Sequence, residues 1–401
     1  MKLSTHIINK GYQSELSEGS LVAPVFRTST FCFPTSESGK RSFEIAYHLD
    51  KPKENETLPL IYSRVNNPNM EILEERLSIL NHSQKSLVLS SGMGAISNTC
   101  LTFLKPGDSL IYSEPVYGGT DFLFNHTLPN LGINCLPIDS SSPSDNLTDL
   151  VATTPNLKII FIETPCNPLL KLTSISEISD IIKKVDSDIL LIVDNTMIGP
   201  LYLNPLKLGA DLVVYSITKF LGGHSDLVAG GVSGNQDLIT QIGVSRTIFG
   251  TILDPDTCWL IKRSLATLKL RMEQQTENAK QIISFLKEHS KISKIYYPGY
   301  GSVQEQDIFK REYSDSGSII SFEIDGGEKK CFQILNKFQI FKLAVSLGSI
   351  ESLVQHPSSM THSDMTPEQK ERSGITDSLI RMSIGLEDSD DLINDLRLAL
   401  E

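Results

Sequence analysis

The sequence predicts an α/β fold built on a mostly parallel β-sheet that helices cover on both faces. From residue 66 to about residue 255, short apolar runs alternate with longer, more polar segments that have the length of helices. Parallel strands buried on both faces form continuous apolar runs, and helices separate them along the chain. The predicted strands are Ser86–Leu89, Ser109–Tyr112, Ile133–Ile138, Lys158–Ile162, Ile189–Val193 and Asp211–Tyr215.

The composition divides the chain into three parts. Residues 1–65 contain many Gly, Ser and Pro residues and predict a coil-rich arm that contacts a neighbouring subunit, with disorder as the alternative. Residues 66–255 hold the predicted sheet, at whose strand ends such folds bind their ligands. Residues 256–401 predict a smaller α+β C-terminal domain.

The C-terminal domain is expected to begin with a helix. Asp254 followed by Pro255 is a typical helix start, with Asp as the N-cap and Pro at the first position. The elements expected after it are one long helix through Trp259 to Leu286, strands at Gly317–Ile324 and Lys342–Leu347, and a closing helix at Asp390–Leu400.

The bulk composition excludes several classes of protein. A net charge of -12, from 36 basic and 48 acidic residues, disfavours a nucleic-acid partner. No apolar run reaches the ~18 residues of a membrane span, and no secretory signal follows Met1. The six cysteines show no CxxC spacing, which predicts reduced thiols and a cytoplasmic location. No metal site is predicted.

Lys219 is the first candidate for chemistry, because it comes directly after a buried strand. The strand Asp211–Tyr215 continues into Ser216, Ile217 and Thr218, so two hydroxyl groups precede the lysine. Most lysines are solvated surface groups, and that is the alternative here. Lysine is also the residue that forms Schiff bases with carbonyl compounds, and the hydroxyl groups could hold an adjacent phosphate.

Asp194 ends the next buried strand upstream. A buried carboxylate is costly unless it is paired. Pyridoxal 5′-phosphate (PLP) requires one carboxylate on its pyridinium nitrogen, because the protonated ring is the electron sink. The two candidates therefore fit a PLP site together, although Asp194 taken alone fits a helix N-cap equally well.

A phosphate site is predicted at Ser90-Ser91-Gly92-Met93-Gly94, where small residues join a strand to a probable helix. The exposed N–H groups of a helix N-terminus bind anions. The segment lacks the third glycine of a dinucleotide fingerprint, since that position is Ser97. A single phosphate is therefore the better fit.

Two further turns follow predicted strands. In one, Pro165 and Pro168 fix a rigid turn that holds Glu163 and Asn167 at the sheet edge, and the alternative is an ordinary structural turn. The other places Tyr117 before Gly118 and Gly119, where the ring could stack on a flat cofactor or simply pack in the core.

Together these segments closely resemble the Cys/Met-metabolism family of PLP enzymes, which includes cystathionine γ-synthase, cystathionine β- and γ-lyases and methionine γ-lyase. The resemblance extends from about Pro24 to the C-terminus. It rests on rare motifs in the family's order, namely Tyr62-Ser63-Arg64, Ser91-Gly92-Met93, Tyr117-Gly118-Gly119-Thr120, Glu163–Pro168, Asp194-Asn195-Thr196, Ser216–Lys219, Ser346-Leu347-Gly348, His356–His362 and Arg381–Gly385.

The resemblance implies the aminotransferase-like fold known as fold type I, PLP as cofactor, and a homotetramer built from two catalytic dimers. The implied catalytic residues are Lys219, which would carry the cofactor and shuttle protons, Tyr117, which would stack on the ring, and Tyr62. The implied cofactor contacts are Lys219, Asp194, Tyr117, Gly92, Met93, Ser216, Thr218, Asn167 and Thr196, with Tyr62 and Arg64 reaching the phosphate from the neighbouring subunit. The implied substrate contacts are Arg381, Ser346, Leu347, Asn167 and Val345.

The resemblance implies a carbon–sulfur lyase of cysteine and methionine metabolism, acting on cystathionine or a related sulfur amino acid. Gly119 disfavours a methionine γ-lyase, in which Cys is typical, whereas Val345 is typical of that enzyme. The balance slightly favours a cystathionine lyase, and methionine γ-lyase, cystathionine γ-synthase and an inactive PLP-binding scaffold are the alternatives. An inserted stretch at Tyr47–Leu60 and the residues Asn66 and Asn69 depart from the family pattern, and we expect them to affect substrate specificity.

Overall fold

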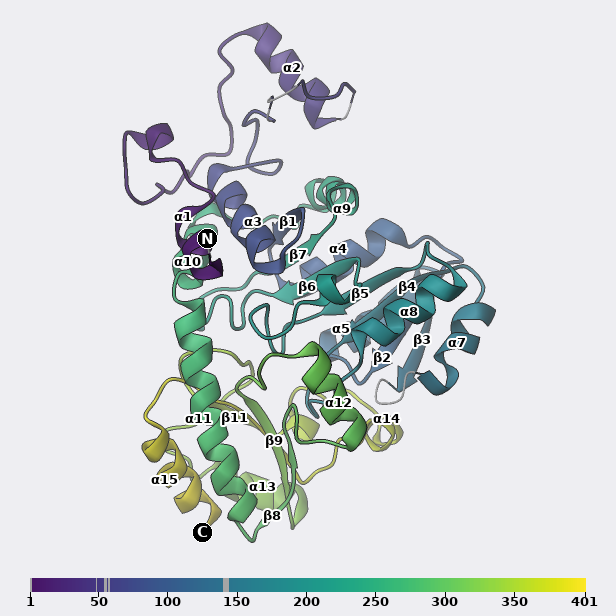
Figure 1. Cartoon of the computed structure of the whole chain (residues 1–401), viewed down its shortest axis with the longest axis vertical. Helices are drawn as coiled ribbons and strands as arrows, with labels where there is room; N and C mark the ends of the chain where they lie inside the picture. Colours follow the sequence, from purple (N-terminus) through teal and green to yellow (C-terminus); the bar gives the residue numbers. More distant parts are fainter. Residues whose placement is uncertain (1, 48, 54–55, 57, 140–143) are drawn as a thin grey trace.

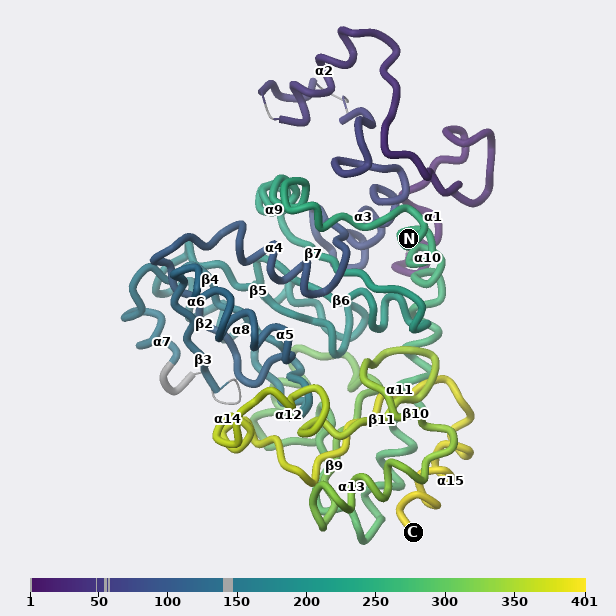
Figure 2. The backbone as a smooth tube through the Cα atoms, turned by 180° about the vertical axis from the view of Figure 1, so that it is seen from behind, coloured from purple at the N-terminus to yellow at the C-terminus, as the bar shows by residue number. Residues whose placement is uncertain are grey.

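The computed structural model describes residues 2–47, 49–53, 56, 58–139 and 144–401, and it confirms the predicted α/β class. A seven-stranded sheet forms the upper half of the body in Figure 1, and a five-stranded sheet forms the lower half. The N-terminal arm with helix α2 (Ser36–Ala46) projects away from this body, and Figure 2 shows the same from behind. Within the described ranges, no helix has the length and apolar character needed to cross a membrane.

All six predicted strands of the large sheet are present, each within two residues of its predicted bounds. They run parallel in the central and outer part of the sheet, as the continuous apolar runs indicate. The order across the sheet is β1-β7-β6-β5-β4-β2-β3. The strands are β1 (Lys85–Leu89), β2 (Ser109–Glu114), β3 (Asn134–Asp139), β4 (Leu157–Glu163), β5 (Leu190–Asp194), β6 (Leu212–Ser216) and β7 (Gly230–Gly234).

Side chains of the large sheet alternate between two apolar cores, one on each face. On β6, Leu212 and Val214 belong to one core, whereas Val213 and Tyr215 belong to the other. The helical segments of this part are α3 (Pro68–Asn81), α4 (Gly92–Phe103), α5 (Gly118–Phe122), a π-helical turn (Leu123–Thr127), α6 (Leu128–Asn130), α7 (Ser144–Thr153), α8 (Ile175–Val185), a 3-10 turn (Pro205–Leu208) and α9 (Gln236–Phe249). Helices α4 and α9 cover the first face, and α3 and α8 cover the second.

Strand β7 was not predicted, because three of its five residues are glycines and glycine lowers strand propensity. Tertiary packing explains the composition. A Cβ atom on Gly230 would lie 2.0 Å from the carbonyl oxygen of Ser91, and one on Gly234 would lie 2.6 Å from Leu212. The strand pairs antiparallel with both β1 and β6, so it closes the sheet beside the predicted phosphate loop.

The N-terminal arm is rich in coil, as predicted, and its described residues also form short helical segments. It holds α1 (Leu3–Asn9), a 3-10 turn (Ser14–Ser17) and α2. A reciprocal capping box starts α2, in which Thr35 accepts from the Ser38 amide and Ser38 accepts from the Thr35 amide. The Gly, Ser and Pro residues therefore act as caps and turns between short helices.

The C-terminal part corrects two predictions. The expected long helix is two helices, because the Ser264 carbonyl is bound by the Thr267 amide and by the buried guanidinium of Arg271 where the first helix ends. The expected strand Lys342–Leu347 ends at Leu343, because the chain then turns into the cavity and Ser346 adopts a φ of 96°. The elements are α10 (Pro255–Leu265), α11 (Leu268–Glu288), β8 (Ile292–Tyr296), α12 (Val303–Glu312), β9 (Ile319–Ile324), α13 (Gly327–Leu335), β10 (Lys342–Leu343), β11 (Leu353–Gln355), a 3-10 turn (Pro357–Ser359), α14 (Pro367–Ser373), β12 (Leu379–Ser383) and α15 (Ser389–Leu400).

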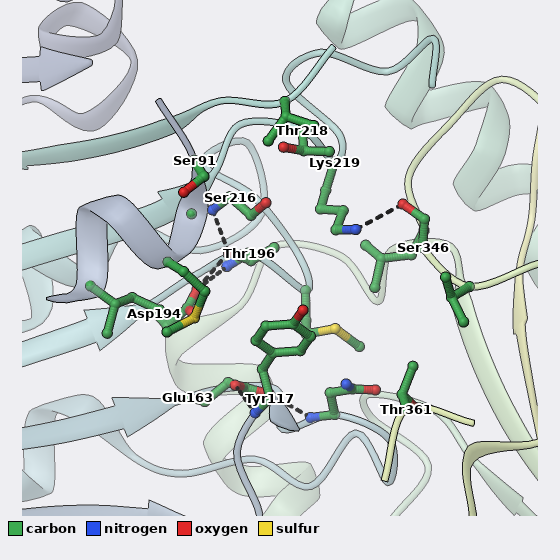
Figure 3. Close-up of a pocket in the computed structure, with 18 of the residues that line it drawn as sticks. Ser91, Tyr117, Glu163, Asp194, Thr196, Ser216, Thr218, Lys219, Ser346 and Thr361 are labelled. Atoms are coloured by element: carbon green, nitrogen blue, oxygen red, sulfur yellow. Dashed lines mark hydrogen bonds between the residues drawn. The ribbon is translucent and has the colours of Figure 1, made fainter. Parts of the chain in front are cut away.

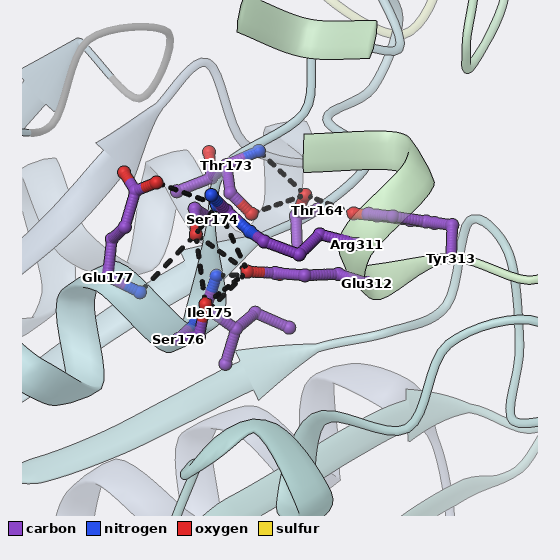
Figure 4. A network of polar contacts seen from close by, with 9 residues as sticks. All are labelled: Thr164, Thr173, Ser174, Ile175, Ser176, Glu177, Arg311, Glu312 and Tyr313. Carbon is purple, nitrogen blue, oxygen red and sulfur yellow. Dashed lines mark hydrogen bonds and ion pairs between the residues drawn. The ribbon is translucent and has the colours of Figure 1, made fainter. Parts of the chain in front are cut away.

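A buried carboxylate connects the two sheet-containing parts (Figure 4). Glu312, at the end of α12, accepts hydrogen bonds from the Ser174 and Ser176 hydroxyls at 2.6 Å each and from the Ile175 amide at 3.0 Å. These groups form the N-terminus of α8, where unpaired N–H groups and the helix dipole favour a negative charge. The part of the C-terminal domain that carries α12 is therefore anchored to the large sheet.

We expect Glu312→Gln to lower the free energy of unfolding by about 1–3 kcal/mol, because a buried N–H donor loses a charged acceptor. Chemical denaturation followed by circular dichroism measures the change. Glu177→Gln is the matched control, since Glu177 only pairs with Arg311 at the surface, and it should cost less than about 1 kcal/mol. Equal losses in the two variants would contradict the role given to Glu312.

Candidate active site

A cavity of about 530 Å³ lies at the carboxyl ends of the parallel strands, where the C-terminal domain meets the sheet (Figure 3). Its volume falls in the usual range for small-molecule sites. Residues that follow β1, β2, β4, β5 and β6 line one side, and three C-terminal segments line the other. The lining residues are Ser91, Gly92, Met93, Ile96, Tyr117, Glu163, Asn167, Asp194, Thr196, Met197, Ser216, Thr218, Lys219, Val228, Val345, Ser346, Leu347, Met360, Thr361 and Arg381.

Lys219 points into this cavity, as the sequence predicted. Its Nζ donates a hydrogen bond of 2.7 Å to Ser346 Oγ, from the opposite domain. Burial, together with the charge of Arg381, lowers the pKa of Lys219 to about 8. A lysine with a lowered pKa is more often neutral near pH 7, which is the form that attacks a carbonyl group.

The backbone on both sides of this contact is constrained. Ser346 is a non-glycine residue with a φ of 96°, and such strain is typical of functional sites. Gly348 lies so close to the Lys219–Phe220 peptide that a Cβ there would be 2.7 Å from the Phe220 nitrogen. Arg271 donates to the Phe220 carbonyl at 2.9 Å and so fixes the loop after the lysine.

Asp194 lies deeper in the cavity, at the end of β5. Its Oδ1 accepts hydrogen bonds from the Thr196 amide at 2.9 Å and from the Thr196 hydroxyl at 2.5 Å. Burial raises the pKa of Asp194 above its ordinary value, against the effect of these two bonds. A cation placed against this carboxylate would favour its charged form, which is what a protonated pyridine nitrogen supplies.

The predicted phosphate-binding residues converge at the N-terminus of α4. Gly92 approaches Ser216 so closely that a Cβ on the glycine would be 2.7 Å from the Ser216 Cβ, so no larger residue fits there. Gly92 and Met93 occupy the first turn of the helix, whose N–H groups have no intrahelical acceptors. The Thr218 hydroxyl is bonded to the main chain of Ala229, at 3.2 Å to its oxygen and 3.0 Å to its nitrogen.

Glu163 belongs to a turn that the sequence singles out but was given no role in the predicted site, and it positions two predicted residues. Its carboxylate accepts from the Tyr117 amide at 2.7 Å and from the Asn167 amide at 2.8 Å. Burial raises the pKa of Glu163, and the neighbouring charge of Asp194 raises it further. The signal that could have identified Glu163 is its place at the end of β4, in register with Asp194 on β5.

Arg381 is a buried cation that lines the cavity from strand β12 of the C-terminal domain. Its Nη1 donates to Asn167 Oδ1 at 2.8 Å, and its Nη2 donates to the Ser346 carbonyl at 2.7 Å. Burial lowers the pKa of Arg381 to about 10, so the side chain stays charged at pH 7. The structure thus brings together Arg381, Asn167 and Ser346, three of the expected substrate contacts, and the other two, Val345 and Leu347, also line the cavity.

Tyr62 and Arg64 do not reach the cavity of their own chain. They lie on the arm, where the Arg64 guanidinium is 5.7 Å from the centre of the Tyr62 ring and donates to the Thr247 carbonyl at 2.9 Å. The Tyr62 side chain is exposed. Their position therefore leaves them available to a neighbouring molecule.

Asn66 and Asn69 are buried and bond main-chain groups, and their expected effect on substrate specificity stays a prediction. Asn66 accepts from the Ile61 amide and donates to the Pro59 carbonyl, and Asn69 bonds main-chain groups of the arm in the same way. Residues 48, 54, 55 and 57 of the inserted stretch lie outside the described residues.

Residues 4–401 match the family described as Cys/Met metabolism PLP-dependent enzyme. The chain belongs to this family. It is 40% identical to an L-methionine gamma-lyase of Fusobacterium nucleatum subsp. nucleatum, over 100% of this chain and 98% of that protein. It is 39% identical to a cystathionine beta-lyase of Lactococcus lactis subsp. cremoris, over 100% and 99%. A crystal structure of cystathionine gamma synthase from Xanthomonas oryzae pv. oryzae superposes with a TM-score of 0.90 at 33% identity, over 100% and 98%.

These findings confirm the predicted family, the fold type and a PLP-dependent lyase acting on sulfur amino acids. The residues present fit the cofactor of the family. A buried lysine amine, a buried carboxylate and a helix N-terminus that only glycine permits surround one cavity, and the exposed Tyr117 ring lies between them (Figure 3). Within the described ranges, no group of three or more acidic, His or Cys side chains could hold a metal ion.

We expect borohydride to attach the cofactor irreversibly to Lys219 in the purified enzyme, because this is the lysine amine that lines the cavity. Peptide mass spectrometry after reduction identifies the labelled residue. Lys219→Ala should abolish the label, and Lys262→Ala, which changes a lysine outside this cavity, should leave it intact. A reducible linkage that survives in Lys219→Ala would refute the assignment.

Proposed function

We propose that this enzyme is a carbon–sulfur lyase whose preferred substrate is a sulfur amino acid with an uncharged distal group, of which methionine is the simplest. The charge distribution of the cavity supports this. Among the described lining residues, Glu163 and Asp194 are the only carboxylates, and both are bound by amides within the site. The described lining of the cavity thus offers no unpaired carboxylate for the distal ammonium group of cystathionine.

Apolar side chains make up much of the remaining lining of the cavity. Val345 follows the short strand β10 and is 56% exposed, and Val228 and Met360 also line the cavity. An apolar wall favours a thioether with a small alkyl group and costs free energy when it faces an unpaired charge. The names of the L-methionine gamma-lyases among the relatives agree with this proposal.

Cystathionine is the second candidate, and Gly119 supports it. A Cβ at this position would lie 2.8 Å from Tyr117 Cε1 and 3.0 Å from Met93 Sδ. The Tyr117 ring therefore occupies the space that a cysteine side chain would need. Relatives of comparable identity carry the names cystathionine gamma-lyase and cystathionine beta-lyase.

Different residues of the chain carry out different steps of the proposed reaction. PLP, when bound, supplies the electron sink that stabilises negative charge at the substrate α-carbon. Arg381 and Asn167 bind the substrate carboxylate through hydrogen bonds, which the charge of the guanidinium strengthens. Lys219, with its pKa of about 8, removes the α-proton, and for γ-elimination a second proton must leave the β-carbon.

We further propose that the active enzyme is a homotetramer of two catalytic dimers, in which the arm of one chain completes the site of its neighbour. The projecting arm and the exposed Tyr62 support the proposal. Exposed apolar side chains on the arm, Leu16, Leu21 and Leu49, are typical of a surface that a partner covers. Six cysteines without a disulfide support a cytoplasmic location.

Mixing Arg64→Ala chains with Lys219→Ala chains should restore part of the activity that each variant lacks. The reason is that a hybrid dimer has one site with both an intact Lys219 and an intact Arg64 from the neighbour. Thiol release after co-refolding measures the rescue, and Arg263→Ala mixed with Lys219→Ala is the control for an unrelated basic residue. Absence of rescue after proven subunit exchange would assign Arg64 to its own chain's site.

Val345→Glu should raise kcat/KM for cystathionine relative to methionine by about tenfold, because the new carboxylate can pair with the distal ammonium group. The desolvation of the glutamate offsets part of the gain. Keto acid release from the two substrates measures the ratio, and Val345→Gln is the uncharged control. A preference of the wild-type enzyme for cystathionine over methionine would refute the proposed substrate class.

A further inference from the structure

The segment His356–His362, which follows β11, carries two buried histidines that the proposed reaction does not use. His362 lies next to Thr361, whose side chain lines the cavity. We propose that His362 positions Arg381 for the substrate α-carboxylate, acting through Thr361 and Gln355. This inference rests on the proposed function, in which Arg381 binds that carboxylate.

Gln355 connects the guanidinium to the threonine. Strands β11 and β12 place Gln355 directly opposite Arg381, and the glutamine side chain is buried. With its amide oxygen toward the guanidinium, Gln355 accepts from Nη1 and Nη2 of Arg381 at 3.1 Å each and from Thr361 Oγ1 at 3.1 Å. The opposite orientation would place the glutamine NH2 group against these donors, so the hydrogen-bond network selects the first.

His362 completes the chain of hydrogen bonds from Thr361 through Gln355 to Arg381, which we call the relay. Its Nδ1 lies 2.9 Å from Thr361 Oγ1. Burial and the charge of Arg381 lower the pKa of His362 to about 4, against a hydrogen bond to the Asn167 main chain, so the ring is neutral at pH 7 and carries one hydrogen. Because the threonine hydroxyl donates its hydrogen to Gln355, its oxygen accepts from His362, which assigns that hydrogen to Nδ1.

The relay determines the direction of a glutamine that contacts both terminal nitrogens of Arg381. Without the donor on His362, the Thr361 hydroxyl is free to turn, and Gln355 loses one of the three donors that hold its oxygen toward Arg381. A reversed glutamine would place its NH2 group against the guanidinium and displace it from the carboxylate. We therefore expect His362 to affect recognition of the carboxylate, while the attachment of PLP at Lys219 stays intact.

The test compares two sulfur-free substrate analogues. Norleucine carries the charged α-carboxylate, whereas norleucinamide carries an uncharged amide in its place. Binding to the PLP-loaded enzyme is followed by the change in cofactor absorbance, and the ratio of the two dissociation constants is the readout. His362→Leu should raise the dissociation constant of norleucine about tenfold and leave that of norleucinamide unchanged. His362→Asn, whose amide can donate near the Nδ1 position, should restore most of the ratio.

Thr361→Val removes the middle of the relay and should reduce the ratio as His362→Leu does. The double variant should lose no more than either single variant, since both break one chain of hydrogen bonds. Thr361→Val also tests the proposal independently if His362→Leu does not fold. An unchanged ratio in Thr361→Val would overturn the relay.

His356→Leu is the matched control, because His356 is equally buried but bonds Ser359 at 2.8 Å and the Asp377 carbonyl at 2.9 Å, with no contact to Arg381. It should keep the ratio of the unchanged enzyme, whatever its effect on stability. An unchanged ratio in His362→Leu, or equal weakening of both analogues, would overturn the inference. A lack of preference for norleucine in the unchanged enzyme would instead overturn the proposed role of Arg381.

Discussion

The site depends on one constraint, namely that four ionisable side chains, three of them buried and Lys219 partly buried, meet at the carboxyl edge of the parallel strands. Taking Glu163, Asp194, Lys219 and Arg381 out of water costs several kcal/mol each unless they are bound by other groups. Each of them is bound, by main-chain amides, hydroxyls or a carbonyl. Because these partners come from both domains, the charges hold the cavity in one shape before any ligand enters.

The same contacts explain why the two domains must keep their relative position. Ser346 reaches Lys219 from a strained backbone, and Arg381 spans from β12 to Asn167 on the turn after β4. The Glu312 carboxylate fixes α12 to the N-terminus of α8 on the same side of the molecule. Stability of the interface and geometry of the site are therefore one property, since a shift between the domains would break bonds to the buried charges.

The arm has the opposite character. Asn66 and Asn69, which follow it, bond main-chain groups of the arm, and several apolar side chains of the arm, among them Leu16 and Leu21, are exposed. Exposed apolar side chains of this kind are typical of a surface that a partner covers.

Much of the fold and of the site could be predicted from local sequence. Six apolar runs predicted six strands within two residues, because buried parallel strands need continuous apolar residues. Lys219, Asp194 and the Gly92 loop were placed in one site because parallel strands bring their carboxyl ends to one edge. The family followed from rare motifs in a fixed order along the chain.

Contacts between distant segments could not be predicted in this way. The glycines of β7 form a strand only because the Ser91 carbonyl and Leu212 leave no room for side chains. The break before α11 depends on Arg271, and Glu163 became a site residue only when its amide partners were visible. Local sequence determines which segments are apolar, capped or turned, whereas close approach and the pairing of buried charges depend on residues far apart in the chain, and only the tertiary structure decides them.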